Sequence, residues 1–361
     1  MSMQLPDPTP VGQFLGLELD ARGWTQSDFA AVIGRPTQFV SEIVTGKKEI
    51  TRESAAQIGA AFGQTAEFWL NLQDAFLLSE QAKDSKTQRV LDAVRRRARL
   101  NELAPVSVLQ KRNVLLGSTL EELEAEIIDL FELRSVDEDP SFAIAARRSN
   151  DQEVVSAVQN AWVACVRREA RKARNRVSLR PFSQKNLSEL AGTLPAQLQT
   201  PEQFRTLPQL FADAGVILVY VEALPGAKID GCAFILDETP VIGLSGRGKR
   251  LDKILFTLLH ETAHVLLDHV KTVTIVEALD DANDGDDNEK DANASAAAWL
   301  LPTPLPAAPE RVSAGWVATV AAQRSLAPIV VIGQLQNAKV LEWRTTLARN
   351  APTVTDELES W

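Results

Sequence analysis

The stretch "LFTLLHETAHVLLDH" (residues 255–269) constrains the fold of this chain more than any other. It holds all three histidines of the 361 residues, two of them in the pattern His-Glu-x-x-His. Residues four apart lie on one face of an α-helix, so His260 and His264 would direct two imidazoles at one ion, with Glu261 beside them. Apolar neighbours predict that this helix is buried, where an unpaired histidine pair would be costly. The stretch therefore predicts a zinc site on a buried helix.

A zinc site that performs catalysis takes three protein ligands and leaves one position open, so a third ligand is required. The longer metzincin pattern places Gly at position 267 and His at position 270, where this chain has Leu267 and Val270. His269 misses the pattern by one position. We expect it at the surface, pointing away from the ligand face.

A carboxylate further along the chain remains as the third ligand. Glu289 stands at the start of an Ala-rich segment that predicts a helix packed against the histidine helix. Asn293 lies four residues later on the same face, where it would hydrogen-bond a metal ligand. Asp291 is the rival ligand. The remaining acids of residues 280–291 are expected to form a solvated loop.

The rest of the chain changes periodicity twice. A helical pattern runs from Val11 to about residue 205, interrupted by a polar stretch at 79–85 that predicts a linker. Three short β-branched runs, "AGVILVYVEAL", "DGCAFILD" and "TPVIGLSG", then predict three strands. The helical pattern resumes at about Lys249 and continues after Pro302 in a mainly helical tail.

The net charge of −10 does not suggest a protein coated by nucleic acid, so any DNA contact must come from a local basic patch. The run "RREARKARNR" (residues 167–176) has two interpretations. It is either a nucleic-acid surface or, as we favour, a solvated helix face paired with nearby carboxylates.

Two distant cysteines, Cys165 and Cys232, indicate a reducing compartment without a disulfide framework. The N-terminal residues lack the basic and apolar regions of a signal peptide. No apolar run approaches the roughly 18 residues that span a membrane. We expect a cytoplasmic protein without a membrane partner.

The segment "TQSDFAAVIGRPTQFVSEIVTGKKEIT" fits a helix-turn-helix. Ala30 is the small residue where the two helices touch, Gly34 makes the turn, and Val40 and Ile43 face the core. The second helix of such a motif places its N-terminal residues on base edges in the major groove.

Several side chains of this motif are candidates for contact with double-stranded DNA. Gln38 is the best base reader, because Gln can bond adenine through two hydrogen bonds. Glu42 and Glu49 argue against DNA binding by their charge, and the alternative is a module kept for protein contacts alone. The predicted DNA-binding residues are Gln26, Arg35, Thr37, Gln38, Ser41, Lys47 and Lys48.

Residues from about 214 to 302 resemble the ImmA/IrrE family of zinc metallopeptidases. Three features carry the resemblance. They are a short predicted sheet, the motif "FTLLHETAHVLLDH" that follows it, and a Glu-x-x-x-Asn helix that ends in Leu-Leu-Pro. It implies that the third zinc ligand is Glu289, four before Asn293 and thirteen before the Pro. Family members commonly have Glu where this chain has Asp291, and Leu/Ile-Gly between the motif's Glu and second His, so the chain departs at both places.

The resemblance implies peptide hydrolysis. Two neutral imidazoles and one carboxylate leave a zinc site with net positive charge, which lowers the pKa of its water to about 7. Glu261 would take the proton and later deliver it to the leaving amine. We expect the strand at residues 239–245, just before the motif helix, to be a sheet edge that binds the substrate in extended form.

Residues 10–76 resemble the Xre-type fold of HigA-like antitoxins. "TPVGQFLGLELDARGWTQ" and "ITRESAAQIGAAFGQTAEFWLNLQ" carry this resemblance. It implies binding to operator DNA and the homodimers that such proteins often form.

The expected fold is multidomain and mainly α: an all-α helix-turn-helix domain (1–80), a helical connecting region (81–205), an α+β zincin-like peptidase domain with a small sheet (206–302) and a C-terminal helical region (303–361). Peptidases of the ImmA/IrrE type are associated with cleaving Xre-type repressors. We therefore expect a DNA-binding transcriptional regulator with a zinc-dependent endopeptidase that cleaves an Xre-type repressor or antitoxin-like protein. The alternative is an antitoxin-like repressor whose zinc domain senses a signal without cleaving.

Overall fold

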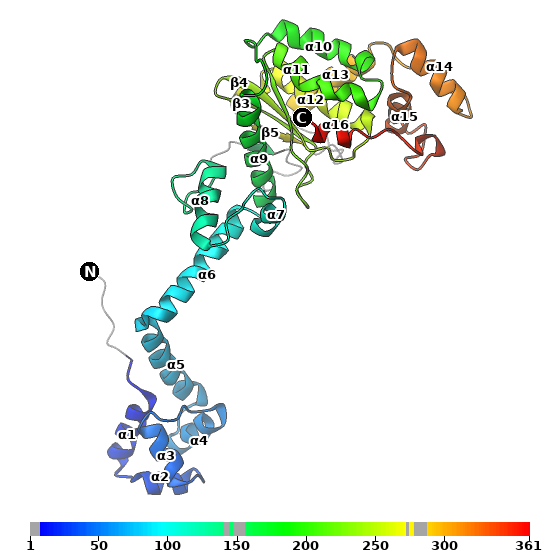
Figure 1. Ribbon diagram of the computed structural model, residues 1–361. Helices are drawn as coiled ribbons and strands as arrows, with labels where there is room; N and C mark the ends of the chain where they lie inside the picture. The colour runs from blue at the N-terminus through cyan, green and yellow to red at the C-terminus, as the bar shows by residue number, and fades with distance from the viewer. Residues whose placement is uncertain (1–7, 141–143, 147–155, 272–273, 278–286) are drawn as a thin grey trace. The chain divides into compact units, whose positions relative to one another are not determined.

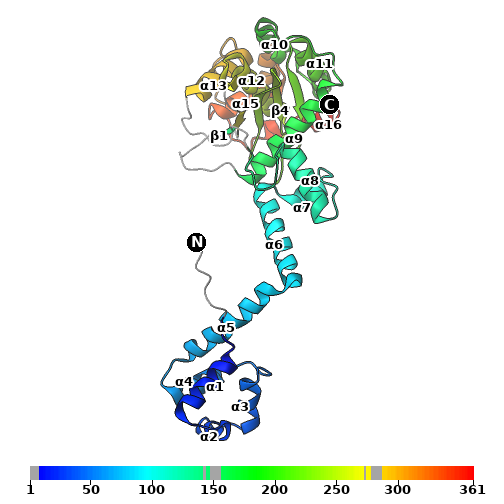
Figure 2. The ribbon, with the colours of Figure 1, turned by 90° about the vertical axis from the view of Figure 1, so that its left-hand side faces the viewer.

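The computed structural model describes residues 8–140, 144–146, 156–271, 274–277 and 287–361 (Figures 1 and 2). The chain divides into two compact units, Met1–Arg96 and Arg97–Trp361. Each unit encloses hydrophobic residues of its own, so its fold follows from its own packing. The mainly α architecture with one α+β part, expected from the sequence, is confirmed.

The first unit builds an apolar core from five helices. Leu15, Phe29, Ile58 and Trp69 are fully buried in this core. Gly12 lets the first helix pack closely against the third, because a Cβ there would collide with the backbone carbonyl of Ile43. The helices are α1 (Val11–Arg22), α2 (Gln26–Val32), α3 (Thr37–Val44), α4 (Arg52–Phe62) and α5 (Ala66–Lys83).

Helices α2 and α3 form the expected two-helix motif. A capping box begins α2: the Asp28 backbone N–H donates to Thr25 Oγ1 (3.1 Å), and the Thr25 N–H donates to the Asp28 carboxylate (2.9 Å). The turn uses Gly34 with φ +66°, a left-handed conformation that suits glycine. Val40 and Ile43 are buried, as expected of the core face of α3.

The polar stretch at 79–85 is mainly helical, so the expectation of a linker there is wrong. Helix α5 continues to Lys83, and α6 (Ser85–Leu103) begins two residues later. Asp84 marks the boundary, because its carboxylate accepts hydrogen bonds from the backbone N–H groups of Lys86 (3.3 Å) and Thr87 (2.9 Å). The polar composition reflects exposed helix surface instead of a loop.

The second unit contains a five-stranded sheet in the order β1-β5-β3-β4-β2. Strand β3 pairs antiparallel with β4 and β5, while β2 pairs parallel with β4 and β1 parallel with β5. The three predicted strands are β2, β3 and β4; β1 and β5 were not predicted. The strands are β1 (Ile144–Ala146), β2 (Ile217–Tyr220), β3 (Gly231–Leu236), β4 (Thr239–Leu244) and β5 (Thr274–Glu277).

The position of β4 overturns one hypothesis. Val241 is paired with Ile217 of β2 on one side and with Phe234 of β3 on the other. The backbone hydrogen-bonding groups of β4 are therefore already used, and residues 239–245 do not form a sheet edge that could add an extended substrate. The connection to the motif helix leaves from an interior strand.

Helices cover both faces of this sheet, as alternate side chains of β3 show. Ala233 lies in the hydrophobic cluster that contains the motif helix α12. Cys232 and Phe234 lie in the cluster that contains α9. The helices of this unit, besides α6, are α7 (Val106–Lys111), α8 (Leu120–Phe131), α9 (Ala157–Arg174), α10 (Gln184–Gln197), α11 (Leu207–Asp213), α12 (Leu251–Leu266), α13 (Asp287–Leu300), α14 (Ala314–Arg324), α15 (Pro328–Asn337) and α16 (Thr355–Glu359), with short 3-10 turns η1 (Pro201–Thr206), η2 (His269–Lys271) and η3 (Thr346–Ala348).

Segments on both sides of residues 206–302 share these clusters. Trp162 of α9 donates its indole N–H to the Val221 carbonyl (2.8 Å), and the C-terminal Trp361 donates to the Phe204 carbonyl (3.1 Å). Packing thus joins Arg97–Trp361 into one compact unit. The limits predicted at 80, 205 and 302 stay an interpretation of the sequence.

The basic run on α9 is paired with acids. Arg167 and Arg171 both reach Glu132, at 3.2 and 2.7 Å, and Lys172 reaches Glu169 at 2.8 Å. These pairs confirm the favoured interpretation of a solvated helix face.

Among the described residues, no single helix is long and apolar enough to cross a membrane. Taken together, helices α14 and α15 are long and apolar enough, but the pair is bent by 107° at the break between them.

Candidate functional site

The motif helix α12 is almost entirely buried. Leu255, Leu258 and Leu259 pack into the hydrophobic cluster beneath the sheet. The same helix buries His260 and His264 completely, each with 0% exposure. Such polar rings are tolerated in a core only when both nitrogens have partners.

The two imidazoles and one carboxylate meet at a single point. His260 Nε2 and His264 Nε2 lie 2.8 Å apart. Each faces an oxygen of Glu289 at 3.4 Å. One potential ligand atom from each residue falls within 4.8 Å of the others, so the described structure brings the three predicted metal ligands together.

Glu289 holds this place and Asp291 does not. Glu289 lies in the first turn of α13 and is 7% exposed, whereas Asp291 is exposed. Burial by itself would raise the pKa of the Glu289 carboxyl, but the two imidazoles hold that pKa well below its usual range. The side chain is therefore an anion, the form that binds a metal. Residues 278–286, which include most of the predicted acidic loop, lie outside the described residues.

A second set of contacts orients the two histidines. Asn293, one helical turn after Glu289, places Oδ1 3.1 Å from His260 Nδ1. An amide oxygen only accepts, so His260 carries its proton on Nδ1 and presents the Nε2 lone pair to the site. Asn293 thus has the geometry of the supporting role predicted for it.

His269 is not the surface residue we expected. It is half-buried, and its Nδ1 lies 3.0 Å from Nδ1 of His264. The expectation assumed a continuous helix, but α12 ends at Leu266 and Asp268 takes a left-handed φ of +62°. This turn brings the chain back, so the spacing rule for helices does not apply to His269.

Glu261 lies on the same helix with its carboxylate directed at the sheet. Its exposure is 0%, and it packs against Gly231, the first residue of β3. A Cβ at Gly231 would meet Glu261 Oε1 at 2.5 Å and its Cγ at 2.9 Å. Sequence reasoning missed Gly231, since a Gly after Asp indicates only a turn.

The donor set fits a zinc ion. Two imidazole nitrogens and a carboxylate oxygen are ligands that zinc prefers. Metal–ligand distances of about 2.0–2.1 Å give a tetrahedral edge of about 3.3 Å. The two His–Glu distances of 3.4 Å match that edge, while the His–His distance of 2.8 Å is shorter.

The predicted DNA-binding residues lie on or beside α3. Thr37, Gln38, Lys47 and Lys48 are exposed, whereas Gln26, Arg35 and Ser41 are half-buried. Glu42 accepts hydrogen bonds from Gln38 Nε2 (2.9 Å) and Lys48 Nζ (3.1 Å). These contacts, with the hydrogen bond from Gln38 as the larger cause, lower the pKa of Glu42. Glu42, one of the two acids that argued against DNA binding, is thus held as a carboxylate, and the ammonium of Lys48 offsets its charge locally.

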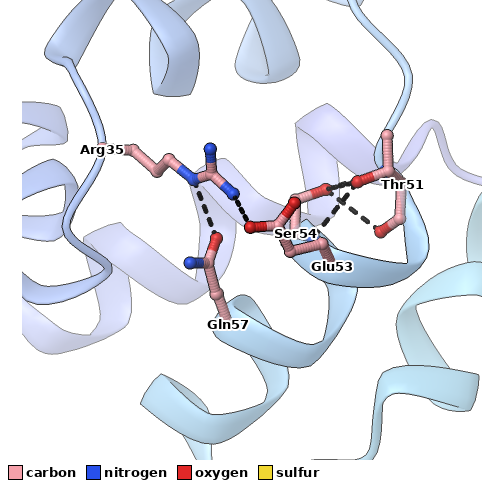
Figure 3. A network of polar contacts seen from close by, with 5 residues as sticks. All are labelled: Arg35, Thr51, Glu53, Ser54 and Gln57. Atoms are coloured by element: carbon pink, nitrogen blue, oxygen red, sulfur yellow. Dashed lines mark hydrogen bonds and ion pairs between the residues drawn. The ribbon is translucent and has the colours of Figure 1, made fainter.

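Arg35 is engaged inside the first unit. Figure 3 shows its guanidinium directed at α4, where Nε donates to Gln57 (3.0 Å) and NH2 pairs with Glu53 (2.5 Å). The same view shows Thr51 and Ser54 capping the start of α4. Arg35 therefore ties the turn of the two-helix motif to α4.

Comparison with known proteins identifies both parts of the chain. Residues 216–322 match the IrrE N-terminal-like domain, Peptidase_M78. The first part is 33% identical over 94 residues to an uncharacterized HTH-type transcriptional regulator of Haemophilus influenzae, covering 26% of this chain and 88% of that protein.

The chain belongs to the HTH-type transcriptional regulators.

Antitoxin HigA-1 of Vibrio cholerae is another relative of this HTH-type regulator, 38% identical over 69 residues, 19% of this chain and 65% of that protein. A solved addiction module antidote protein of the HigA family from Coxiella burnetii is 33% identical, with 23% of this chain and 91% of that chain covered and a TM-score of 0.22. The domain match at 216–322 supports a metallopeptidase-type enzyme, and that family implies a metal. The matched range includes His260, Glu261, His264 and Glu289.

Proposed function

We propose that this HTH-type regulator is a zinc-dependent endopeptidase that cleaves an Xre-type repressor or an antitoxin-like protein. One observation carries the proposal: donor atoms of the buried side chains His260, His264 and Glu289 lie within 4.8 Å of one another. The IrrE N-terminal-like match over 216–322 supports it. Helices α12 and α13, which carry the three residues, pack against each other. This packing would hold the donor atoms in place before an ion binds.

The proposal gives each residue a separate role. His260, His264 and Glu289 would hold the ion. When bound, zinc supplies a Lewis acid that polarises a carbonyl and makes water acidic enough to attack near neutral pH. Glu261 would take the proton of the attacking water on its carboxylate and pass it to the nitrogen of the leaving amine.

The first unit would deliver this activity to its substrate. Similarity to HTH-type regulators supports binding to operator DNA, with Gln38 on base edges and Lys47 and Lys48 on phosphates. A repressor bound to the same DNA, or paired with this unit in a dimer, would then meet the peptidase at raised effective concentration.

The deciding experiment compares cells that express the native chain with cells that express Glu261→Gln. The substitution keeps the size of the side chain and removes the base. Glu310→Gln, a change of the same kind at an exposed position of the same unit, is the matched control. The proposal is supported if an Xre-type protein gains new N-termini in cells with the native or the Glu310→Gln chain but not in cells with Glu261→Gln. Identical termini in all three, under stress as well as rest, would refute it.

A second candidate is a repressor whose metal domain senses a signal without cleaving. Its support is that the first part of the chain matches 88% of the length of an HTH-type transcriptional regulator. Glu261 separates the two candidates, since a repressor does not need that carboxylate. Unchanged operator repression by Glu261→Gln, together with unchanged N-termini, would favour this second candidate.

A further inference from the structure

His269 contacts a proposed metal ligand from outside the helix that carries it. Its ring centroid lies 5.2 Å from that of His264, with 62° between the ring planes. The two Nδ1 atoms are 3.0 Å apart, a hydrogen-bond distance. His269 belongs to η2, which follows the left-handed turn at Asp268.

The tautomer of His264 depends on which of the two rings donates the hydrogen bond in this contact. A neutral imidazole has one donor and one acceptor nitrogen, so a single proton lies between the two Nδ1 atoms. If His264 donates it, the Nε2 lone pair of His264 faces Glu289 and the Nε2 of His260. If His269 donates it, His264 Nε2 would hold a proton and could not bind a metal.

We propose that His269 is a positioning residue that accepts the Nδ1–H of His264 and so fixes the ring and tautomer of this metal ligand. The inference rests on the proposed metal centre. It assigns His264 the same kind of support that Asn293 provides for His260 at 3.1 Å. The two supports come from different elements, η2 and α13, so each can be removed without the other.

The contact has consequences for metal affinity. Loss of a residue that orients a metal-binding histidine typically costs 10–100-fold in affinity. We expect a loss of that size from His269→Ala, because the His264 ring would be free to turn and to change tautomer. His269→Asn should restore much of the affinity, because Oδ1 of Asn occupies nearly the place of Nδ1 and also accepts.

The test measures zinc affinity of the full-length chain by competition with a coloured chelator, and needs no substrate. The variants are His269→Ala, His269→Asn and, as a matched control in the same turn, the exposed Leu267→Ala. Circular dichroism of the metal-free chains checks that each variant folds. Cobalt-substituted samples add a spectrum that reports the geometry of the ligands.

Four outcomes are distinct. A 10–100-fold weaker affinity for His269→Ala, with rescue by Asn and native affinity for Leu267→Ala, supports the inference. Affinity of His269→Ala within about twofold of native overturns it and leaves the metal centre standing. A native chain that binds no zinc overturns both, whereas missing cleavage with intact zinc binding counts against the proposed function alone.

Discussion

At the proposed metal centre, His260 and His264 have no exposed surface, and both nitrogens of each ring face a polar atom. On α3, by contrast, the exposed Gln38 and Lys48 share the carboxylate of Glu42. The buried set cannot exchange its partners for water, so its geometry is set before a ligand arrives. The exposed set uses local contacts that DNA can replace. A single change should therefore have a larger effect at the centre than on α3.

Removal of the metal should have the largest effect. We expect a strong chelator to abolish peptide hydrolysis and to destabilise the unit Arg97–Trp361. Its free energy of unfolding should fall by about 2.7 kcal/mol compared with a sample that contains free zinc at 100 times the Kd. Helices α1 to α4, which contain none of the three ligands, should be unaffected. Hydrogen exchange of the full chain measures both units together. Equal loss of protection in both would contradict the contrast between them.

Gly231→Ala should be next. Its Cβ would collide with the Glu261 carboxylate, and the three nearest atoms all belong to that side chain. A displacement of about 1 Å can cost about 10²-fold in rate, so we expect such a loss with zinc affinity unchanged. Gly192→Ala in α10 is the control, since a Cβ there meets nothing within 4 Å. Full activity of Gly231→Ala would show that the carboxylate does not need this space.

Gln38→Ala should weaken binding to the preferred operator by about 1–3 kcal/mol and relax specificity at one base pair. Lys47→Ala, its comparison, should weaken binding to all sequences and reduce the salt slope by about 1. Fluorescence anisotropy with DNA selected from a random pool measures both. A uniform loss for Gln38→Ala across sequences would place Gln38 on the backbone of the DNA.

Arg35→Ala should have the smallest effect. Its partner Glu53 is 73% exposed, so the ion pair contributes about 0.2–1 kcal/mol at most. We expect slightly weaker protection of α2 to α4 in hydrogen exchange and an unchanged salt slope for DNA. Arg52→Ala, an exposed arginine at the start of α4, is the control. If Arg35→Ala instead reduces the salt slope, that result would support the DNA contact that the sequence predicted for Arg35.

The sequence was sufficient wherever a rule of local spacing applied. The spacing of four between His260 and His264 placed both rings on one face, and short β-branched runs between turn residues located β2, β3 and β4. The resemblance that chose Glu289 over Asp291 agrees with their burial. These features depend on the helical period of 3.6 residues and on local runs of β-branched residues, which a chain shows without its fold.

Other features depend on contacts between distant segments. His269 approaches His264 because α12 ends at Leu266 and the chain turns at Asp268. Gly231 matters because β3 brings it against Glu261, thirty positions away. The interior place of β4 depends on two pairing partners. The sequence by itself determined which side chains we predict to bind a metal and to read DNA. Only the tertiary structure decided that His269 contacts His264 and that Gly231 contacts Glu261, because no local period encodes the proximity of these residues.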